Sequence, residues 1–291
     1  MSGEFHRSHM TVYTMVNSGG VNHAIVCLNS LLEHNKDKIV LRIANDGSLS
    51  SGEIEALSCA FGTCIIDSEL TADEVKSFAE RFPLTWAYGS KHPIFRKALH
   101  LPLIHSRCQT REPFRFIDSD ILFFRDHCGI FTSEAEWDCF SEDLAVTLGL
   151  RDLIKWKTPI HGIINSGIIS SHYPNYDLIE SFLRTTKDTI GKIHEQFAWI
   201  ISNHDRPVSL ISQDYIQIEN RWRRLDSSDI SENCIALHLT GHRKRDIQFY
   251  LRLLDEVDCS RFIEVKKTIS HPRSSYTMAL LKCYKRIMHH A

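Results

Sequence analysis

The sequence lacks the features of a membrane-spanning, secreted or nucleic-acid-binding chain. No apolar run reaches the roughly 18 residues needed to cross a bilayer, and the N-terminus has no signal-peptide core. The formal net charge is -2 over 291 residues, so nothing in the composition favours nucleic acid as a partner. The 9 cysteines are odd in number and never spaced as Cys-x-x-Cys, which argues against a disulfide framework and a zinc knuckle. We therefore expect a protein of a reducing, cytoplasmic compartment.

Internal repeats, low-complexity tracts and linkers rich in Gly, Pro or Ser are also absent, so we expect one continuous domain over residues 11–265. Residues 1–10 are set aside as a cloning remnant. Residues 266–291 carry basic side chains beside an apolar stripe at helical spacing, which predicts an amphipathic C-terminal helix. That helix either docks on the domain or holds the protein at the inner face of an anionic membrane.

The hydrophobic pattern alternates between strands and helices. It predicts strands at 11–16, 39–46 and 63–67, and helices at 24–34, 48–62, 71–82 and 93–107. Such alternation builds an α/β fold, with a mostly parallel central sheet flanked by helices, as in Rossmann-like proteins. Because parallel sheets bind ligands at the carboxyl ends of their strands, the loops at 17–22 and 45–48 are candidate ligand loops.

An acidic pair interrupts the apolar stretch FRFIDSDILFF at residues 114–124. Asp118 and Asp120 add nothing to a buried strand, since an uncompensated charge there costs several kcal/mol, about 3–5 when its partner is missing. We expect the strand to end at this pair. Two carboxylates so close repel each other unless a cation lies between them, and Mg²⁺ and Mn²⁺ prefer oxygen ligands. A turn in which Asp and Ser cap the next segment is the alternative.

This Asp-Ser-Asp resembles the Asp-x-Asp of GT-A type glycosyltransferases, in which the motif holds a divalent metal against the diphosphate of a nucleotide-sugar. Other stretches are similar to motifs of the same family, in the same order: NDGSLS (45–50), IINSGIISS (163–171), EQ (195–196) and LHLTGHRK (237–244). The variant that the set resembles is the retaining, glycogenin-like group. The resemblance covers residues 11–245 with gaps and implies the GT-A fold.

The resemblance also implies roles for individual residues. It implies a metal site of Asp118, Asp120 and His238; donor contacts from Asp46, Lys97, Asp118, Ser119, Gly241 and Lys244; and Asn165, Glu195 and Gln196 around the transferred sugar. Each residue also has an ordinary alternative. His238 could be a core histidine, Lys97 a surface residue, Lys244 part of a solvated basic turn, Asp46 and Asn165 turn residues, and Gln196 part of a polar helix face.

The expected function is metal-dependent transfer of a sugar from a UDP-sugar to an acceptor hydroxyl, with Mn²⁺ or Mg²⁺ acting on the diphosphate leaving group. The acceptor could be a glycan, a lipid-linked sugar, a protein or a small molecule. The resemblance favours retention, although Glu195 could serve as the base of an inverting reaction. Two other functions remain: an inactive nucleotide-sugar-binding protein, and a metal-dependent phosphatase, which Leu122 and the position of the motif disfavour.

Overall fold

The computed structural model describes most of the chain and divides it into two compact units. Unit 1 comprises residues 1–66, 117–130 and 214–267, and unit 2 comprises residues 67–116, 131–213 and 268–291. The described residues are 10–62, 65–66, 70–91, 95–107, 112–126, 130–131, 138–142, 164–172, 174–186, 195–203, 208–219, 225–239, 246–262 and 270–272. Among the described helices, none is long and apolar enough to cross a membrane.

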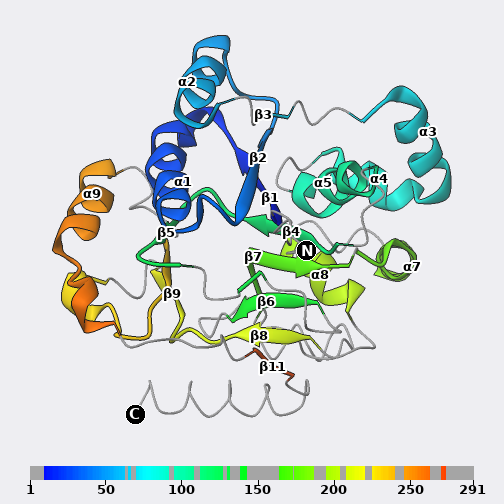
Figure 1. Cartoon of the computed structure of the whole chain (residues 1–291). Coiled ribbons are helices and arrows are strands. Elements are labelled where there is room, and N and C mark those ends of the chain that lie inside the picture. The colour runs from blue at the N-terminus through cyan, green and yellow to red at the C-terminus, as the bar shows by residue number, and fades with distance from the viewer. Residues whose placement is uncertain are drawn as a thin grey trace, which may run out of the picture. The chain divides into compact units, whose positions relative to one another are not determined.

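The first part of unit 1 alternates parallel strands with helices (Figure 1). Its elements are β1 (Met10–Val16), the short 3-10 helix η1 (Ser18–Gly20), α1 (Val21–Asn35), β2 (Ile39–Asn45), α2 (Ser51–Phe61) and β3 (Ile65–Ile66). β1 pairs in parallel with β2, and β2 with β3. The loops that follow β1 and β2 therefore lie at the same edge of the sheet.

Helix α2 begins at a capping box that the sequence encodes directly. The Ser50 hydroxyl accepts a hydrogen bond from the Glu53 N–H at 3.4 Å, and the Glu53 carboxylate accepts one from the Ser50 N–H at 2.8 Å. The helix ends at Gly62, whose φ of 73° lies in the region that favours glycine. Both ends of α2 are thus fixed by local chemistry.

The remainder of unit 1 is a small three-stranded sheet with a helix. It contains β5 (Ile121–Phe123), β9 (Ile216–Glu219), η4 (Ser227–Asp229), β10 (Ala236–Leu239), α9 (Ile247–Glu256) and η6 (Cys259–Arg261). β10 is the central strand, antiparallel to β5 and parallel to β9. Leu122, Leu237 and Leu239 bury their side chains in one cluster with Tyr250 of α9 and Cys27 of α1. Burial of this cluster fixes β5 and β10 against α1 and α9.

Unit 2 combines a mixed sheet with five helices among its described residues. Its elements are α3 (Ala72–Arg81), α4 (Pro83–Gly89), α5 (Arg96–Ser106), β4 (Phe114–Ile117, whose last residue falls in unit 1), β6 (Cys139–Glu142), β7 (Ile164–Ser171), α7 (Tyr176–Thr186), α8 (Glu195–Ser202), β8 (Ser209–Ile211) and β11 (Ser270–Pro272). β6 is antiparallel to β7 and parallel to β8, and β8 is antiparallel to β11. Trp199 of α8 is fully buried, with ring centroids 6.4 Å from Phe114 and 5.8 Å from Phe140.

A carboxylate from α7 caps the N-terminus of α4. Glu180 is 5% exposed and accepts hydrogen bonds from the N–H groups of Leu84 and Thr85 at 3.2 and 2.8 Å, and from the Thr85 hydroxyl at 2.9 Å. The first turn of a helix has N–H groups without intrahelical partners, and a carboxylate there also interacts favourably with the helix dipole. The Glu180 side chain therefore joins two helices that are distant in the sequence.

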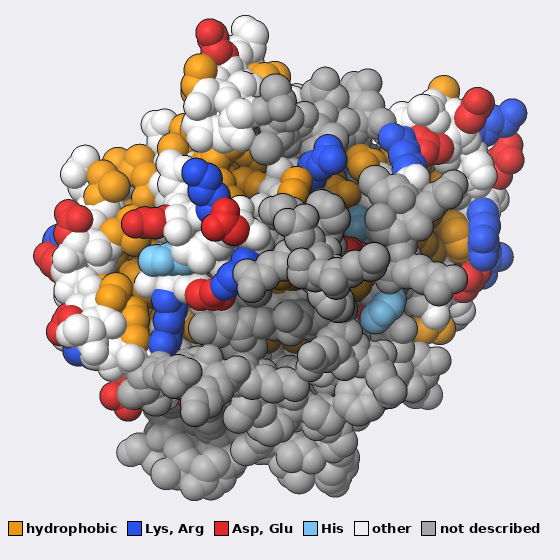
Figure 2. All heavy atoms as spheres, viewed as in Figure 1, with side chains coloured by type: hydrophobic (Ala, Val, Ile, Leu, Met, Phe, Trp, Pro, Cys, Tyr) orange, Lys and Arg blue, Asp and Glu red, His pale blue; other side chains and the backbone are white. Residues whose placement is uncertain are grey.

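The predicted fold class is confirmed: the protein is α/β, with a mostly parallel central sheet flanked by helices. The expected end of the strand at the acidic pair is confirmed: β4 ends at Ile117, and a second strand, β5, begins at Ile121. Helix α4 was not predicted, because its seven residues carry only Pro83 at the start and Gly89 at the end as helix signals. Figure 2 shows acidic and basic side chains interspersed over the described part of one face.

The predicted boundaries at 11–265 and 266–291 stay predictions. Within the expected C-terminal helix, Ser270–Pro272 form strand β11 instead, because they pair with β8. The rest of that segment, including its apolar stripe, lies outside the described residues, as do residues 1–9. Membrane contact through the C-terminal segment therefore remains a prediction.

Candidate functional site

The acidic pair lies in the turn that joins β4 to β5 in the sequence. β4 ends at Ile117 and β5 begins at Ile121, so Asp118, Ser119 and Asp120 form the connection. The Asp118 side chain is 29% exposed and that of Asp120 is 10% exposed. One carboxylate is thus open to a ligand from solvent, while the other is held in the interior, where its charge is costly unless compensated.

His238 reaches this turn because of the register between β10 and β5. It lies directly across from Ile121, and the N–H of the following Leu239 donates to the carbonyl of Asp120 at 3.0 Å. Its Nε2 is 3.2 Å from Oδ1 of Asp120 and 3.6 Å from Oδ2 of Asp118. The same ring's Nδ1 is buried, with no hydrogen-bond partner among the described residues. Strand pairing therefore joins residues far apart in the sequence into one triad.

The donor set of this triad fits a divalent metal ion. Asp118, Asp120 and His238 each offer one ligand atom, and these three atoms lie within 4.8 Å of one another. Two carboxylates and a neutral imidazole suit Mn²⁺ and Mg²⁺. Neighbouring ligands of an octahedral ion with bonds of about 2.1 Å are about 3 Å apart, close to the separations observed. The metal triad predicted from the sequence is therefore geometrically assembled.

The residues expected to touch the donor beside the triad are only partly described. Ser119 lies between the two aspartates and is partly exposed. Gly241 and Lys244 lie outside the described residues, so their expected contacts with the diphosphate stay predictions.

The expected nucleotide-contacting residue Asp46 lies in a tight turn after β2. Its Oδ1 accepts from the N–H and the hydroxyl of Ser48 at 2.9 and 2.5 Å, while Asn45 accepts from the N–H of Gly47 at 2.8 Å. Gly47 has a φ of 94°, a conformation that glycine adopts without strain. Asp46 therefore lies in a turn, and its contact with a nucleotide stays a prediction.

A hydrogen bond connects this turn to the loop after β1. The Ser18 N–H donates to the Ser48 hydroxyl at 2.9 Å, although 30 residues separate them in the sequence. The two loops expected to bind a ligand, at 17–22 and 45–48, are thus joined to each other in unit 1.

A second polar cluster, in unit 2, contains residues expected near the transferred sugar. Lys97 of α5 forms an ion pair with Glu195 of α8, with 3.3 Å between Nζ and Oε2, and also donates to the carbonyl of Ser166 at 3.3 Å. The Lys97 ammonium lies 5.3 Å from the centroid of the Phe116 ring. Because the Lys97 side chain is only 3% exposed, the alternative reading of Lys97 as a surface residue was wrong.

Asn165 belongs to the same region, in the fully buried strand β7. Its Oδ1 accepts from the Gly167 N–H at 2.7 Å, and the Ser141 hydroxyl donates to its carbonyl at 3.0 Å. Asn165 therefore lies in a strand, but its side chain accepts from the N–H of Gly167 as in the turn alternative, so its role near the sugar stays a prediction. Gln196, in the first turn of α8, is partly exposed, so the structure leaves both readings of this residue open.

The structure thus gathers the predicted residues into two groups: the triad in unit 1, and Lys97, Asn165 and Glu195 in unit 2. The Lys97–Glu195 ion pair was missed by sequence reasoning. The sequence does contain a signal for it, because Lys97 directly precedes the apolar stretch ALHLPLI. A charge in an apolar stretch is also the signal that identified Asp118 and Asp120. A common site formed by both groups stays a prediction.

Comparison with known proteins supports the fold. Neither a family model nor a curated protein sequence matches the chain. A structure of an active-site mutant of LgtC matches with a TM-score of 0.55 and 14% identity, covering 85% of this chain and 95% of that one. The galactosyltransferase LgtC with donor and acceptor sugar analogues gives 0.53 and 14%, covering 88% and 97%.

Mouse xyloside xylosyltransferase 1 gives a TM-score of 0.52 with 14% identity, covering 79% of this chain and 96% of the mouse chain. At this identity the likeness concerns the fold alone. The expected GT-A fold is therefore confirmed: the chain has the fold of the GT-A glycosyltransferases.

Proposed function

We propose that the protein is a metal-dependent glycosyltransferase that transfers a sugar from a UDP-sugar to an acceptor hydroxyl. The observation that carries this proposal is the triad of Asp118, Asp120 and His238 on a GT-A fold. Carboxylates held near one another in a partly buried turn need a cation, and a nucleoside diphosphate is a ligand that such a cation would bind from the exposed side of Asp118.

Each residue of the triad has a distinct part in the proposed site. Asp120, which is held in the interior, would fix the position of the ion, while the more exposed Asp118 would leave room for a diphosphate oxygen. His238 offers the Nε2 lone pair and adds no charge. When bound, Mn²⁺ or Mg²⁺ would stabilise the negative charge that develops on the leaving UDP.

The unit 2 cluster would position the sugar. Asn165 would contribute its amide, a group whose chemistry matches sugar hydroxyls, and Gln196 follows Glu195 in the first turn of α8. Lys97 forms an ion pair with Oε2 of Glu195. This ion pair favours a role for the Glu195 carboxylate in orienting the sugar over a role as a catalytic base. We therefore propose a retaining reaction. The NMR anomeric coupling of the product tests this, because inversion would give the opposite anomer.

A thermal-shift panel tests donor and metal together. We expect UDP with Mn²⁺ to raise Tm by several degrees, since a ligand at 100 times its Kd stabilises the folded state by about 2.7 kcal/mol. GDP, ADP and CDP should give smaller shifts, and UDP with a chelator should give none. Asp120→Asn should lose the UDP response, whereas Asp255→Asn, on the exposed face of α9, should keep it. An equal UDP shift in chelator and in Asp120→Asn would contradict the proposal.

Release of UDP then separates an enzyme from an inactive binding protein on the same fold. UDP-glucose, UDP-galactose, UDP-xylose and UDP-N-acetylglucosamine are each incubated with the protein and Mn²⁺ without acceptor. We expect slow hydrolysis of one of them, and loss of this hydrolysis in Asp120→Asn. Binding of all four without release of UDP would support the inactive alternative.

A further inference from the structure

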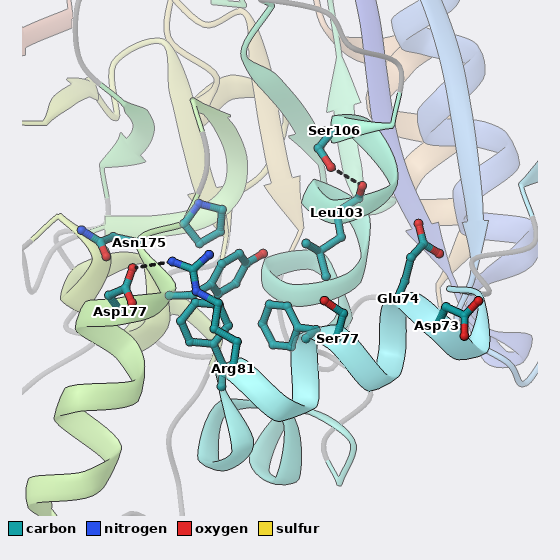
Figure 3. Close-up of a pocket in the computed structure, with 12 residues that line it drawn as sticks. Asp73, Glu74, Ser77, Arg81, Leu103, Ser106, Asn175 and Asp177 are labelled. Atoms are coloured by element: carbon teal, nitrogen blue, oxygen red, sulfur yellow. Dashed lines mark hydrogen bonds and ion pairs between the residues drawn. The ribbon is translucent and has the colours of Figure 1, made fainter.

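A groove on unit 2 lies between helix α3, the end of α5 and the start of α7 (Figure 3). Its volume is about 590 Å³, within the range of about 300–1,000 Å³ found for small-molecule sites. The lining includes Ser77 and Arg81 of α3, Ser106 of α5, and Asn175 just before α7. None of the residues assigned to the metal, the donor or the transferred sugar lines it.

The base of the groove is aromatic. Phe78, Phe82 and Tyr176 line it and contact one another, with centroids 5.0 Å apart for Phe78 and Phe82 and 4.9 Å apart for Phe78 and Tyr176. The Tyr176 hydroxyl donates to backbone carbonyls of α5 at 3.2 Å, which fixes its partly exposed ring. Phe78 and Phe82 are only 7% and 6% exposed, so the partly exposed Tyr176 ring offers most of the aromatic surface to the C–H face of a ligand.

The rim of the groove is polar, and its charged side chains other than Asp73 are paired. Arg81 pairs with Asp177 at 3.4 Å, and Glu74 forms a bidentate ion pair with Arg107. The Arg107 guanidinium holds the pKa of Glu74 at about 2, so this pair stays charged at neutral pH. Paired charges attract a phosphate or a cationic ligand only weakly, because their electrostatic fields largely cancel. Their side chains still offer hydrogen-bond donors and acceptors at the rim.

We propose that this groove binds the neutral sugar units of an oligosaccharide. Such a ligand presents apolar C–H faces to the aromatic base and hydroxyls to the Ser77, Ser106 and Asn175 side chains at the rim. Sugar binding here does not depend on the proposed transfer reaction. The further step, that the groove holds part of an extended glycan acceptor, rests on the proposed function.

Binding of neutral glycans to the full chain, without nucleotide and in chelator, tests the site. The probe is an array of mono- to tetrasaccharides of glucose, galactose, mannose, xylose and N-acetylhexosamines, followed by calorimetry with the glycan that binds most tightly. Ser77→Tyr places a ring in the groove and should weaken binding at least about tenfold. Lys76→Tyr, one position away on the exposed face of α3, should leave affinity unchanged.

If Ser77→Tyr does not fold, as judged by circular dichroism, Ser106→Tyr blocks the groove from α5 instead. The inference is overturned if no glycan on the array binds, or if a groove-filling variant that folds binds with unchanged affinity. Because no donor or metal is present, failure here is distinct from failure of the UDP and Mn²⁺ experiment.

Discussion

Lys97 and Glu195 form an ion pair in the interior of unit 2, with 3.3 Å between Nζ and Oε2 and side-chain exposures of 3% and 2%. Removing one partner leaves an uncompensated buried charge, so Lys97→Met should lower the free energy of unfolding by about 3–5 kcal/mol. The double variant with Glu195→Gln should recover part of this loss, because both charges are then gone. Urea unfolding measures both, with the exposed Lys76→Met as control. Equal effects of Lys97→Met and Lys76→Met would contradict a coupled buried pair.

His238 should contribute directly to metal affinity. We expect His238→Phe to weaken Mn²⁺ binding at least about tenfold, because a ring of similar size replaces the imidazole without offering a ligand atom. The electron paramagnetic resonance signal of free Mn²⁺ reports binding without any need for turnover. His34→Phe, at the exposed end of α1, is the matched control. Unchanged Mn²⁺ affinity in His238→Phe would remove His238 from the metal site.

Glu180 should stabilise unit 2 through its cap on α4. Glu180→Gln keeps the side-chain size but removes the charge that receives three hydrogen bonds from Leu84 and Thr85. We expect a loss of about 1–2 kcal/mol, measured by urea unfolding. Glu80→Gln, on the exposed side of α3, should change stability by less than about 0.5 kcal/mol. A loss no larger than that of Glu80→Gln would argue against the cap.

Stability should fall in mild acid because of His100. Burial, together with the nearby Arg96, lowers the pKa of His100 from 6.5 to about 4. Between these values the unfolded chain binds a proton that the folded chain excludes, so stability declines as pH falls from 6.5 toward 4. The shift corresponds to at most about 3 kcal/mol. Urea unfolding at pH 7 and pH 4.5 should show a smaller difference for His100→Phe than for the unchanged protein; an equal difference would exclude His100 as a cause.

The sequence predicted the elements whose signals are local. The helical pattern at 48–62 and the strand patterns at 11–16 and 39–46 were enough to place α2, β1 and β2. Asp118 and Asp120 were detectable because charges in an apolar stretch need an explanation. His238 needed the resemblance as well, since a histidine on a strand is ordinary by itself.

Features that depend on contacts between residues far apart in the sequence could not be predicted from the sequence. Helix α4 needs Glu180, which comes from a helix far along the chain, and Lys97 acquires its partner only when α5 packs against α8. The strand β11 forms because Leu210 of β8 offers an edge to His271. In each case the local pattern is weak and the tertiary partner decides the outcome.

The division of unit 1 into three separate stretches has a consequence for how the protein is made. The triad takes Asp118 and Asp120 from the middle stretch and His238 from the last one. At a translation rate of about 5–20 residues per second, His238 is synthesised roughly 6 to 24 seconds after Asp118. During that interval the nascent chain holds a pair of aspartates without the strand that brings their third partner. Assembly of the triad is therefore a late event, which follows the release of β10 from the ribosome.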